Sequence, residues 1–420
     1  MFARGRFWWR IVPLIAVFAA AALIVRPQLL AWYHLLQGRL ELARFHPAQA
    51  RAHFERSLRI WPEDAEVHLL ASRAARQNGD FEVADEHLHA CQQAQHGNSK
   101  EVALEWAMLH AASGHLNEVE EFLQRQARED QAHAPLIWEA VASGYIRLYR
   151  PIDALACVEL WLELEPNNVR ALELRGQAYQ TGRQTRKAID DFRRVLEMDP
   201  GREDARYRLV LNLLDTGAYE EALPLLEQLN RQRPDDPDVK VRLARCLFML
   251  DKQDAAKQIL DAVIGAHPDH ARSLTTRAQF AIADDQPDKA ETWLRRAIAV
   301  TPDDYQAQFL LHRALEQQHK PEAAAQLRIA NEAKERAERL SDLRTRKLFD
   351  QPLDPALHYE MGVLLLRGGH DKAGEGWLLS ALQLKPDYPQ AHAALADLYD
   401  RQGDRDRAAE HRRLSGQQQK

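Results

Sequence analysis

Residues 169–200 read VRALELRGQAYQTGRQTRKAIDDFRRVLEMDP, and this stretch decides the fold class. Apolar and small residues recur in it at helical spacing on both sides of a polar turn. With residue 169 counted as position 1, Gly176 falls at position 8, Ala188 at position 20, Phe192 at position 24 and Pro200 at position 32. Two apolar helical stripes joined by a turn predict a pair of antiparallel helices that pack on each other.

The same spacing recurs along most of the chain. Prolines separated by 34 residues are Pro166, Pro200, Pro234, Pro268 and Pro302, followed by the pair Pro352 and Pro386. A small residue recurs at position 20, as Ala50, Ala84, Ala154, Ala188, Ala222, Ala256, Ala290, Ala324, Gly374 and Ala408. A fixed period of this length indicates an array of repeated helical hairpins.

Eleven repeats follow from this frame, and we number them from the N-terminus. They are residues 31–64, 65–98, 99–134, 135–168, 169–202, 203–236, 237–270, 271–304, 305–354, 355–388 and 389–420. The second and third fit the pattern least well. Small residues at positions 8 and 20 let the two helices of a repeat, A and B, approach closely, whereas larger side chains would overpack the contact.

Gly176, Tyr179, Ala188, Phe192 and Pro200 together resemble the signature of the tetratricopeptide repeat (TPR) family. The resemblance covers about 385 residues, counted from the repeat frame. It implies an all-α fold, a right-handed TPR superhelix or α-solenoid of about eleven helix-turn-helix units. It also implies that the A helices line a concave groove, with positions 2, 5, 6, 9, 12 and 13 facing a peptide or protein ligand.

The ninth repeat is longer than the others. Pro302 and Pro352 are 50 residues apart, and residues 321–348 contain no helix breaker, which predicts one helix of about 28 residues or roughly 42 Å. This helix is either a solvated extension of helix B or a docking helix that separates repeats 1–9 from repeats 10–11. We divide the chain into a basic segment 1–10, a transmembrane signal-anchor 11–30, a TPR array 31–354, and a C-terminal TPR pair with a polar tail 355–420.

The N-terminal region predicts a membrane anchor. Ile11–Val25 contains no charged residue, and Arg4, Arg6 and Arg10 precede it. As a helix it spans about 22 Å, so flanking aromatic residues must extend it to cross a core of about 30 Å. The basic residues favour a single-pass protein with a cytoplasmic N-terminus and the array on the outer, periplasmic side. The alternative is a cleaved signal peptide, with its site within Ala19–Ala22, and an exported protein.

Composition and motifs argue against other function classes. The chain carries 56 basic and 62 acidic residues, so nucleic-acid binding is not expected. The glycine-rich run Gly368–Gly376 has Glu375 where a phosphate loop needs lysine. His87 and His89 lie near Cys91, but Cys91 falls at an inward position while His89 points elsewhere. We therefore expect no enzyme activity, no cofactor and no metal.

A ligand surface is predicted on the middle repeats. Helix A of repeats 6, 7 and 8 carries basic, amide and aromatic side chains, namely Tyr207, Arg208, Asn212, Arg242, Arg245 and Arg272. Arginine binds carboxylates bidentately, which suits an extended peptide with acidic side chains. The competing possibility is that Asp204, Asp215 and Asp238 neutralise these arginines within the protein.

The function predicted from these features is a non-catalytic, membrane-anchored scaffold that binds peptides or partner proteins in the concave TPR groove. The alternative is a regulatory or substrate-binding subunit of a membrane-associated enzyme or export complex, for example in polysaccharide or cytochrome assembly.

Overall fold

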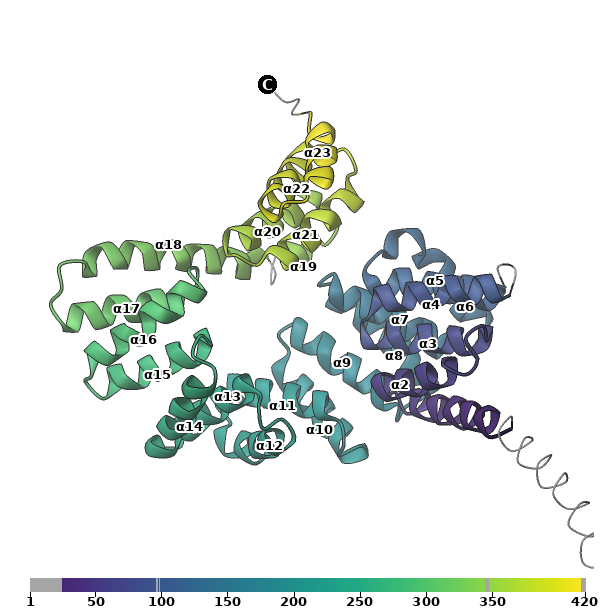
Figure 1. The fold of residues 1–420 in the computed structure, drawn as a ribbon, viewed down its shortest axis with the longest axis horizontal. Helices are drawn as coiled ribbons and strands as arrows, with labels where there is room; N and C mark the ends of the chain where they lie inside the picture. Colours follow the sequence, from purple (N-terminus) through teal and green to yellow (C-terminus); the bar gives the residue numbers. More distant parts are fainter. Residues whose placement is uncertain (1–24, 96, 98, 344–346, 417–420) are drawn as a thin grey trace, which may run out of the picture. The chain divides into compact units, whose positions relative to one another are not determined.

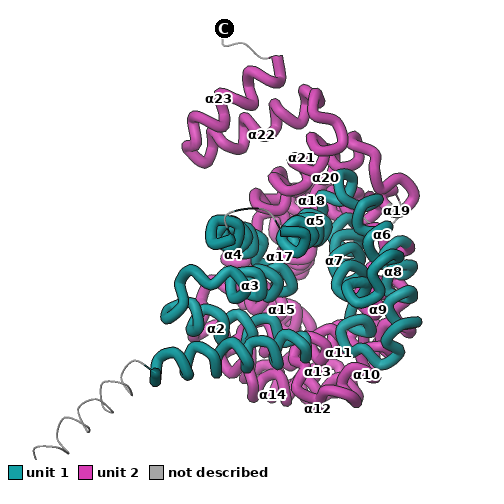
Figure 2. Tube along the Cα trace, turned by 90° about the vertical axis from the view of Figure 1, so that its right-hand side faces the viewer, with its two compact units in different colours: residues 1–148, 153–174 teal, residues 149–152, 175–420 magenta. Residues whose placement is uncertain are grey.

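The computed structural model describes residues 25–95, 97, 99–343 and 347–416 (Figure 1). Within these ranges all regular secondary structure is helical. The all-α fold predicted from the sequence is therefore confirmed, while the handedness of the array stays a prediction. The chain divides into two compact units, which are residues 1–148 with 153–174 and residues 149–152 with 175–420 (Figure 2).

Unit 1 contains the helices of repeats 1–4 and the start of repeat 5. Residues 25–43 are helical, and the elements that follow are α2 (Pro47–Leu58), α3 (Ala65–Asn78), α4 (Phe81–Ala94), α5 (Lys100–Ser113), the 3-10 helix η1 (Leu116–Glu118), α6 (Glu120–Glu129), α7 (Ala134–Arg147), α8 (Pro151–Leu164) and α9 (Val169–Thr181). Helix B of repeat 3 is the irregular one, because η1 replaces its first turn. This is one of the two repeats whose sequence fits the pattern least well.

Unit 2 contains the remaining repeats. Its helices, after the C-terminal part of α9, are α10 (Thr185–Met198), α11 (Glu203–Asp215), α12 (Tyr219–Gln232), α13 (Pro237–Met249), α14 (Gln253–Ala266), α15 (Ala271–Ala283), α16 (Pro287–Val300), α17 (Tyr305–Gln317), α18 (Ala323–Asp342), α19 (Leu348–Asp350), α20 (Pro355–Arg367), α21 (Asp371–Leu384), α22 (Pro389–Gln402) and α23 (Arg405–Leu414). Twelve of these fourteen helices, all except α18 and α19, begin at position 1 or position 17 of a repeat, where the frame places the start of helix A or helix B.

The contact between helices A and B depends on the missing side chain at position 8. A Cβ atom added to Gly176 would lie 2.9 Å from the ring of Phe192 at position 24. The same substitution at Gly362 would place the atom 2.7 Å from Leu378, again at position 24. Real Cβ atoms do not approach other atoms so closely, so only glycine allows this helix separation without a shift of the neighbour.

The alanines at position 20 are fully buried in all repeats that carry one except the ninth. Ala324 is exposed, and its neighbour Ala323 packs against the core of repeats 8 and 9 instead. Helix α18 begins at Ala323, two residues after Pro321, where the frame expected helix B to start. Ala323 therefore takes the packing place expected for Ala324, and this shift of one residue corrects the sequence-based frame for repeat 9.

The long helix docks on the following repeat. Helix α18 covers Ala323–Asp342, and residues 344–346 of the predicted 321–348 helix lie outside the described residues. Beyond its end, Leu343 and Leu348 are buried in one cluster with Leu357 and Met361 of α20. Arg339 of α18 also pairs with Glu360 of α20, with Nη2 2.8 Å from Oε2. These contacts favour the docking helix over the solvated extension. The predicted domain division at residues 354 and 355 stays a prediction.

The predicted membrane location was wrong. Of the expected anchor at residues 11–30, only residues 25–30 are described, and among the described residues no helix is both long and apolar enough to cross a bilayer. Residues 25–30 of the expected anchor belong to the helix 25–43, which buries Ala31 and Leu35 against α2 as helix A of repeat 1. Neither the membrane as a partner, nor the periplasmic orientation, nor the exported alternative is retained.

Each turn from helix A to helix B contains one residue in the left-handed backbone region. In ten repeats this residue is at position 15 of the frame. It is glycine in four of them, with φ between 76° and 85°: Gly79, Gly217, Gly369 and Gly403. In the other six it is an L-residue with φ between 53° and 58°: Phe45, Tyr149, Arg183, Asp251, Asp285 and His319. The left-handed residue ends helix A and reverses the chain.

We predict opposite effects for two Gly→Ala substitutions in unit 2. Gly217→Ala places a Cβ in the left-handed region and is expected to destabilise repeat 6 by about 1 kcal/mol. Gly376→Ala, inside α21 with open space around its Cα, is expected to stabilise repeat 10 by about 0.5–1 kcal/mol. Hydrogen exchange in moderate urea measures both. Equal signs for the two variants would contradict the role assigned to position 15.

Candidate functional site

The six predicted ligand residues lie on the A helices of repeats 6–8. Tyr207, Arg208 and Asn212 belong to α11, Arg242 and Arg245 to α13, and Arg272 to α15. The structure brings Tyr207 and Arg242 together. The Arg242 Nε atom donates to the Tyr207 hydroxyl oxygen at 3.1 Å, and the guanidinium carbon lies 5.4 Å from the ring centroid. A stacked, hydrogen-bonded guanidinium has few orientations to lose when it binds a carboxylate.

The other residues differ in their surroundings. Arg272 pairs with Asp238, the only one of the three expected aspartates that contacts one of these arginines in the described ranges. Asn212 is buried and its Nδ2 donates to the Arg208 carbonyl oxygen at 2.8 Å. Arg208 donates to Gln180 Oε1 at 3.4 Å. Arg245 is exposed and has no ion pair with any described residue.

Apolar side chains share a helical face with Arg245. Phe248 and Met249 follow it by three and four residues in α13, which places all three on one side of the helix. Met249 is 56% exposed. Phe248 stacks on Phe280 of α15, with ring centroids 3.9 Å apart and an interplanar angle of 8°. An unpaired cation therefore stands beside apolar surface on this face.

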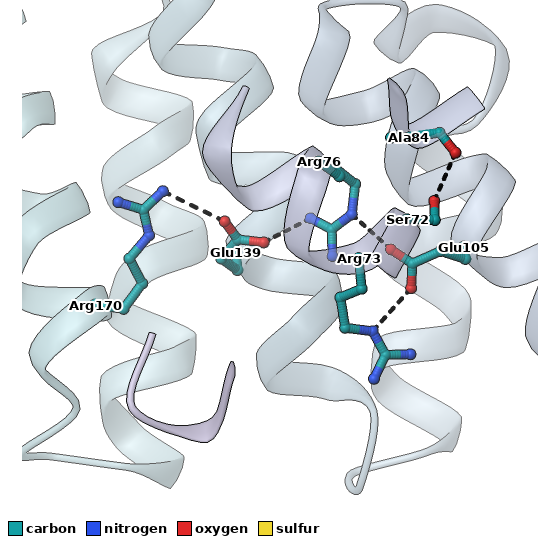
Figure 3. A network of polar contacts seen from close by, with 7 residues as sticks. All are labelled: Ser72, Arg73, Arg76, Ala84, Glu105, Glu139 and Arg170. Carbon is teal, nitrogen blue, oxygen red and sulfur yellow. Dashed lines mark hydrogen bonds and ion pairs between the residues drawn. The ribbon is translucent and has the colours of Figure 1, made fainter. Parts of the chain in front are cut away.

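A second charged cluster, in unit 1, was missed by the sequence analysis. Arg76 of α3 lies between Glu105 of α5 and Glu139 of α7 (Figure 3). Its Nε is 2.7 Å from Glu105 Oε1, and its Nη1 is 2.6 Å from Glu139 Oε2. Arg73 reaches the other oxygen of Glu105 at 3.0 Å, and Arg170 of α9 lies 3.5 Å from Glu139. The network joins helix A of four successive repeats.

Burial makes this network an organising contact for unit 1. The side chains of Arg76 and Glu105 are 0% exposed, and that of Glu139 is 1% exposed. Although burial alone would raise it, the nearby Arg76 and Arg73 lower the pKa of Glu105. Burial likewise opposes the charge on Arg76, but the two glutamates raise its pKa. Arg76 and Glu105 are therefore both charged at neutral pH.

The lowered pKa of Glu105 makes the stability of unit 1 depend on pH. A carboxylate whose folded pKa lies below its unfolded value stabilises the fold above the unfolded value, near 4.5. That contribution is lost as the pH falls through the folded pKa, because protonation removes the charge that Arg76 and Arg73 require.

One sequence signal could have found this network. Glu105 stands at position 7 of repeat 3, one of the helix A positions that the frame turns towards helix B. Arg73, Arg76 and Glu139 stand at positions 9, 12 and 5, which belong to the ligand-facing set. An acid at this packing position is the signal, but repeat 3 fits the frame poorly, so the repeat pattern alone does not make Glu105 stand out.

Comparison with known proteins agrees with the assignment of helical repeats. Two family models described as tetratricopeptide repeat match residues 35–88, 173–237 and 213–280. The chain belongs to the tetratricopeptide repeat family. It is 26% identical over 212 residues to the mouse (Mus musculus) anaphase-promoting complex subunit 7, covering 50% of this chain and 36% of the relative.

Two other TPR proteins are similar to part of this chain. The chain is 28% identical over 222 residues to the TPR repeat-containing protein PA4667 of Pseudomonas aeruginosa, covering 51% of this chain and 34% of the relative. It thus spans about a third of the length of both curated relatives. A crystal structure of YrrB, a TPR protein with an unusual peptide-binding site, aligns with a TM-score of 0.39 at 23% identity, covering 44% of this chain and 95% of that one.

We predict that Arg76→Leu destabilises unit 1 by about 3–5 kcal/mol, because it leaves two buried carboxylates without their shared cation. The matched control is Arg193→Leu in α10, which breaks the half-exposed pair with Glu221 and is expected to change stability by less than about 1 kcal/mol. Urea-dependent hydrogen exchange of α3, α5 and α7 measures the first, and that of α10 and α12 the second. A loss at Arg76 no larger than at Arg193 would contradict the structural role.

Proposed function

We propose that this TPR protein is a non-catalytic scaffold whose A-helix face in repeats 6–8 binds an extended peptide or a partner protein with acidic side chains. TPR proteins mediate protein–protein interactions, and the relatives are named as TPR proteins or as a subunit of a complex. The observation that carries the proposal is Arg245, which is exposed and has no ion pair within the described part of the chain, beside Phe248 and Met249 on one face of α13.

The two arginines of α13 have different roles in this proposal. Arg242 is held by Tyr207, so its orientation is set before the ligand arrives. Arg245 has no internal acid to release, so a carboxylate reaching it does not have to displace another one. Arg272 does have such an acid, Asp238, and Asn212 directs its amide donor to its own helix. Arg272 and Asn212 are therefore expected to contribute less to ligand binding than Arg242 and Arg245.

The name of one relative supports a second candidate function. The mouse protein matched over half of this chain is a subunit of the anaphase-promoting complex. By analogy, the chain would act as a regulatory or substrate-binding subunit of a larger enzyme or export assembly. Co-purification of a stoichiometric enzyme from the native source favours this candidate, whereas capture of varied short acidic segments favours the independent scaffold.

The charge-reversal variant Arg242→Glu/Arg245→Glu tests the ligand surface. The probe is a fluorescent twelve-residue peptide in which glutamates alternate with apolar residues, measured by anisotropy at low salt. We expect the wild-type protein to bind it, with weaker binding at high salt because exposed charges are screened. The variant is expected to lose at least about tenfold in affinity, since two attractive contacts become repulsive.

The matched control is Arg231→Glu/Lys289→Glu, which changes the net charge equally on exposed positions of the B helices α12 and α16. This control is expected to bind as the wild type does. If both double variants weaken binding equally, only overall charge matters. If the folded Arg242→Glu/Arg245→Glu protein binds the peptide unchanged, these arginines are structural and the ligand surface lies elsewhere.

A further inference from the structure

Three repeats contain a pair of histidines that face each other across the hairpin. In each pair one histidine is at position 4 of helix A and the other at position 23 of helix B, 19 residues later. The Nδ1 atoms are 3.0 Å apart in His34–His53, 3.1 Å in His68–His87 and 2.8 Å in His392–His411. The pairs lie in repeats 1, 2 and 11, which are the first two and the last of the array.

The histidine at position 4 has a defined tautomer in two of these pairs. The Nε2 atom of His68 is 3.0 Å from the carbonyl oxygen of Pro62, and that of His392 is 2.9 Å from the carbonyl oxygen of Pro386. A carbonyl oxygen only accepts, so Nε2 carries the proton and donates it. In the neutral ring the Nδ1 atom then has a lone pair and must accept.

The partner at position 23 must therefore donate from its own Nδ1. Each pair holds one proton between two Nδ1 atoms, at a separation that fits a hydrogen bond. A metal ion in the same place would need further ligands, and the described residues contain no group of three histidine, cysteine or acidic side chains that could supply them. The geometry favours a shared proton over a shared metal.

We propose that these histidine pairs are acid-sensitive latches, each of which holds helix A to helix B in its repeat while neutral and releases them when both rings become protonated. A proton added to Nε2 of the position-23 ring leaves the shared hydrogen bond intact. A further proton on the position-4 ring can go only to Nδ1, where it meets the Nδ1 proton of the partner. The two rings are then both positively charged, and their Nδ1–H groups point at each other where one hydrogen bond joined them before.

The groups around the pairs add to this effect in repeats 1 and 2. Arg56 lies near His34 and Arg51 near His87, and each disfavours a further positive charge. In repeat 11 the surroundings of His411 are mixed, since Arg407 opposes protonation while Glu375 and Glu410 favour it. The surroundings therefore disfavour protonation more in repeats 1 and 2 than in repeat 11.

The pKa of one histidine in each pair is lowered, as the proposal requires. Burial, followed by the charge of the partner ring, lowers the pKa of His34, His87 and His411, and for His87 it lowers the pKa to about 4. A histidine whose folded pKa is below its unfolded value of 6.5 stabilises the fold above pH 6.5. This stability is lost progressively as the pH falls from 6.5 towards 4 in repeat 2.

Repeat 10 shows what the same position does without a histidine partner. His358 at position 4 also donates from Nε2 to a proline carbonyl, that of Pro352 at 2.8 Å. Position 23 is Trp377, and the Nδ1 atom of His358 meets the Ser380 hydroxyl at 2.9 Å. A hydroxyl can donate to a neutral ring or accept from a charged one, so this arrangement has no opposed N–H groups.

Hydrogen exchange of the full chain at pH 7 and pH 5, corrected for intrinsic exchange rates, tests the proposal. We expect the opening of α3 and α4 to increase on the order of tenfold at pH 5, because the open repeat can bind a proton on both rings whereas the closed pair excludes the second one. Helices α11 and α12 contain no histidine and are the internal reference, with no such increase expected.

Two variants separate the latch from general acid effects. His87→Asn keeps a donor near the Nδ1 position but cannot be protonated, and it is expected to abolish the pH dependence in repeat 2. His89→Asn is the control, because His89 is on the same helix, exposed and outside the pair. It is expected to retain the pH dependence. Equal opening at both pH values in the wild type, or equal behaviour of the two variants, overturns the proposal.

The tautomers provide a test that needs no variant. Long-range ¹H–¹⁵N correlation spectra of the wild-type protein above pH 7 are expected to show protonated Nε2 in His68 and His392 and protonated Nδ1 in His87 and His411. Because free histidine prefers the Nε2 tautomer, two Nδ1–H rings are a specific signature. Protonated Nε2 with bare Nδ1 in all four rings would overturn the shared-proton arrangement.

Discussion

Close approach between the two helices of a repeat is the constraint on which the structure depends. At Gly176 and Gly362 there is no room for even one methyl group before the side chain at position 24 is reached. Alanine at position 20 supplies the matching small surface on helix B. Because repeats contact mainly their neighbours, the spacing of helices A and B within a repeat also sets which side chains that repeat presents to the next one. The charged and aromatic surfaces described above are consequences of it.

Charge has two distinct uses in the two units. In unit 1, Arg76, Glu105 and Glu139 are removed from water and compensate one another, so they organise helices and offer no accessible charge. In unit 2, Arg245 remains exposed at a comparable place on an A helix, and Tyr207 rather than an acid supports Arg242. The same residue type at ligand-facing positions is thus structural in one unit and, in our proposal, available for a partner in the other.

Repeat 9 shows how a local insertion is absorbed. The additional residues extend α18, whose register differs by one residue from that of the other B helices, and its end is buried with Leu357 and Met361. Helix docking replaces the short turn that joins other repeats. The ion pair between Arg339 and Glu360 fixes this junction by charge as well as by apolar burial.

The sequence by itself determined the helical hairpins, their boundaries and their packing positions, because a period of 34 residues and small residues at positions 8 and 20 are local properties of the chain. It did not determine which polar groups would meet. Glu105 in the poorly fitting repeat 3, the one-residue shift at Ala323, and the encounter of His68 with His87 all depend on distances between helices. The assignment of residues 25–30 to a membrane span failed for the same reason, since only packing shows that the helix 25–43 buries Ala31 and Leu35 against α2. Periodicity specifies which face of a helix is apolar, whereas the tertiary structure decides what that face and its polar neighbours touch.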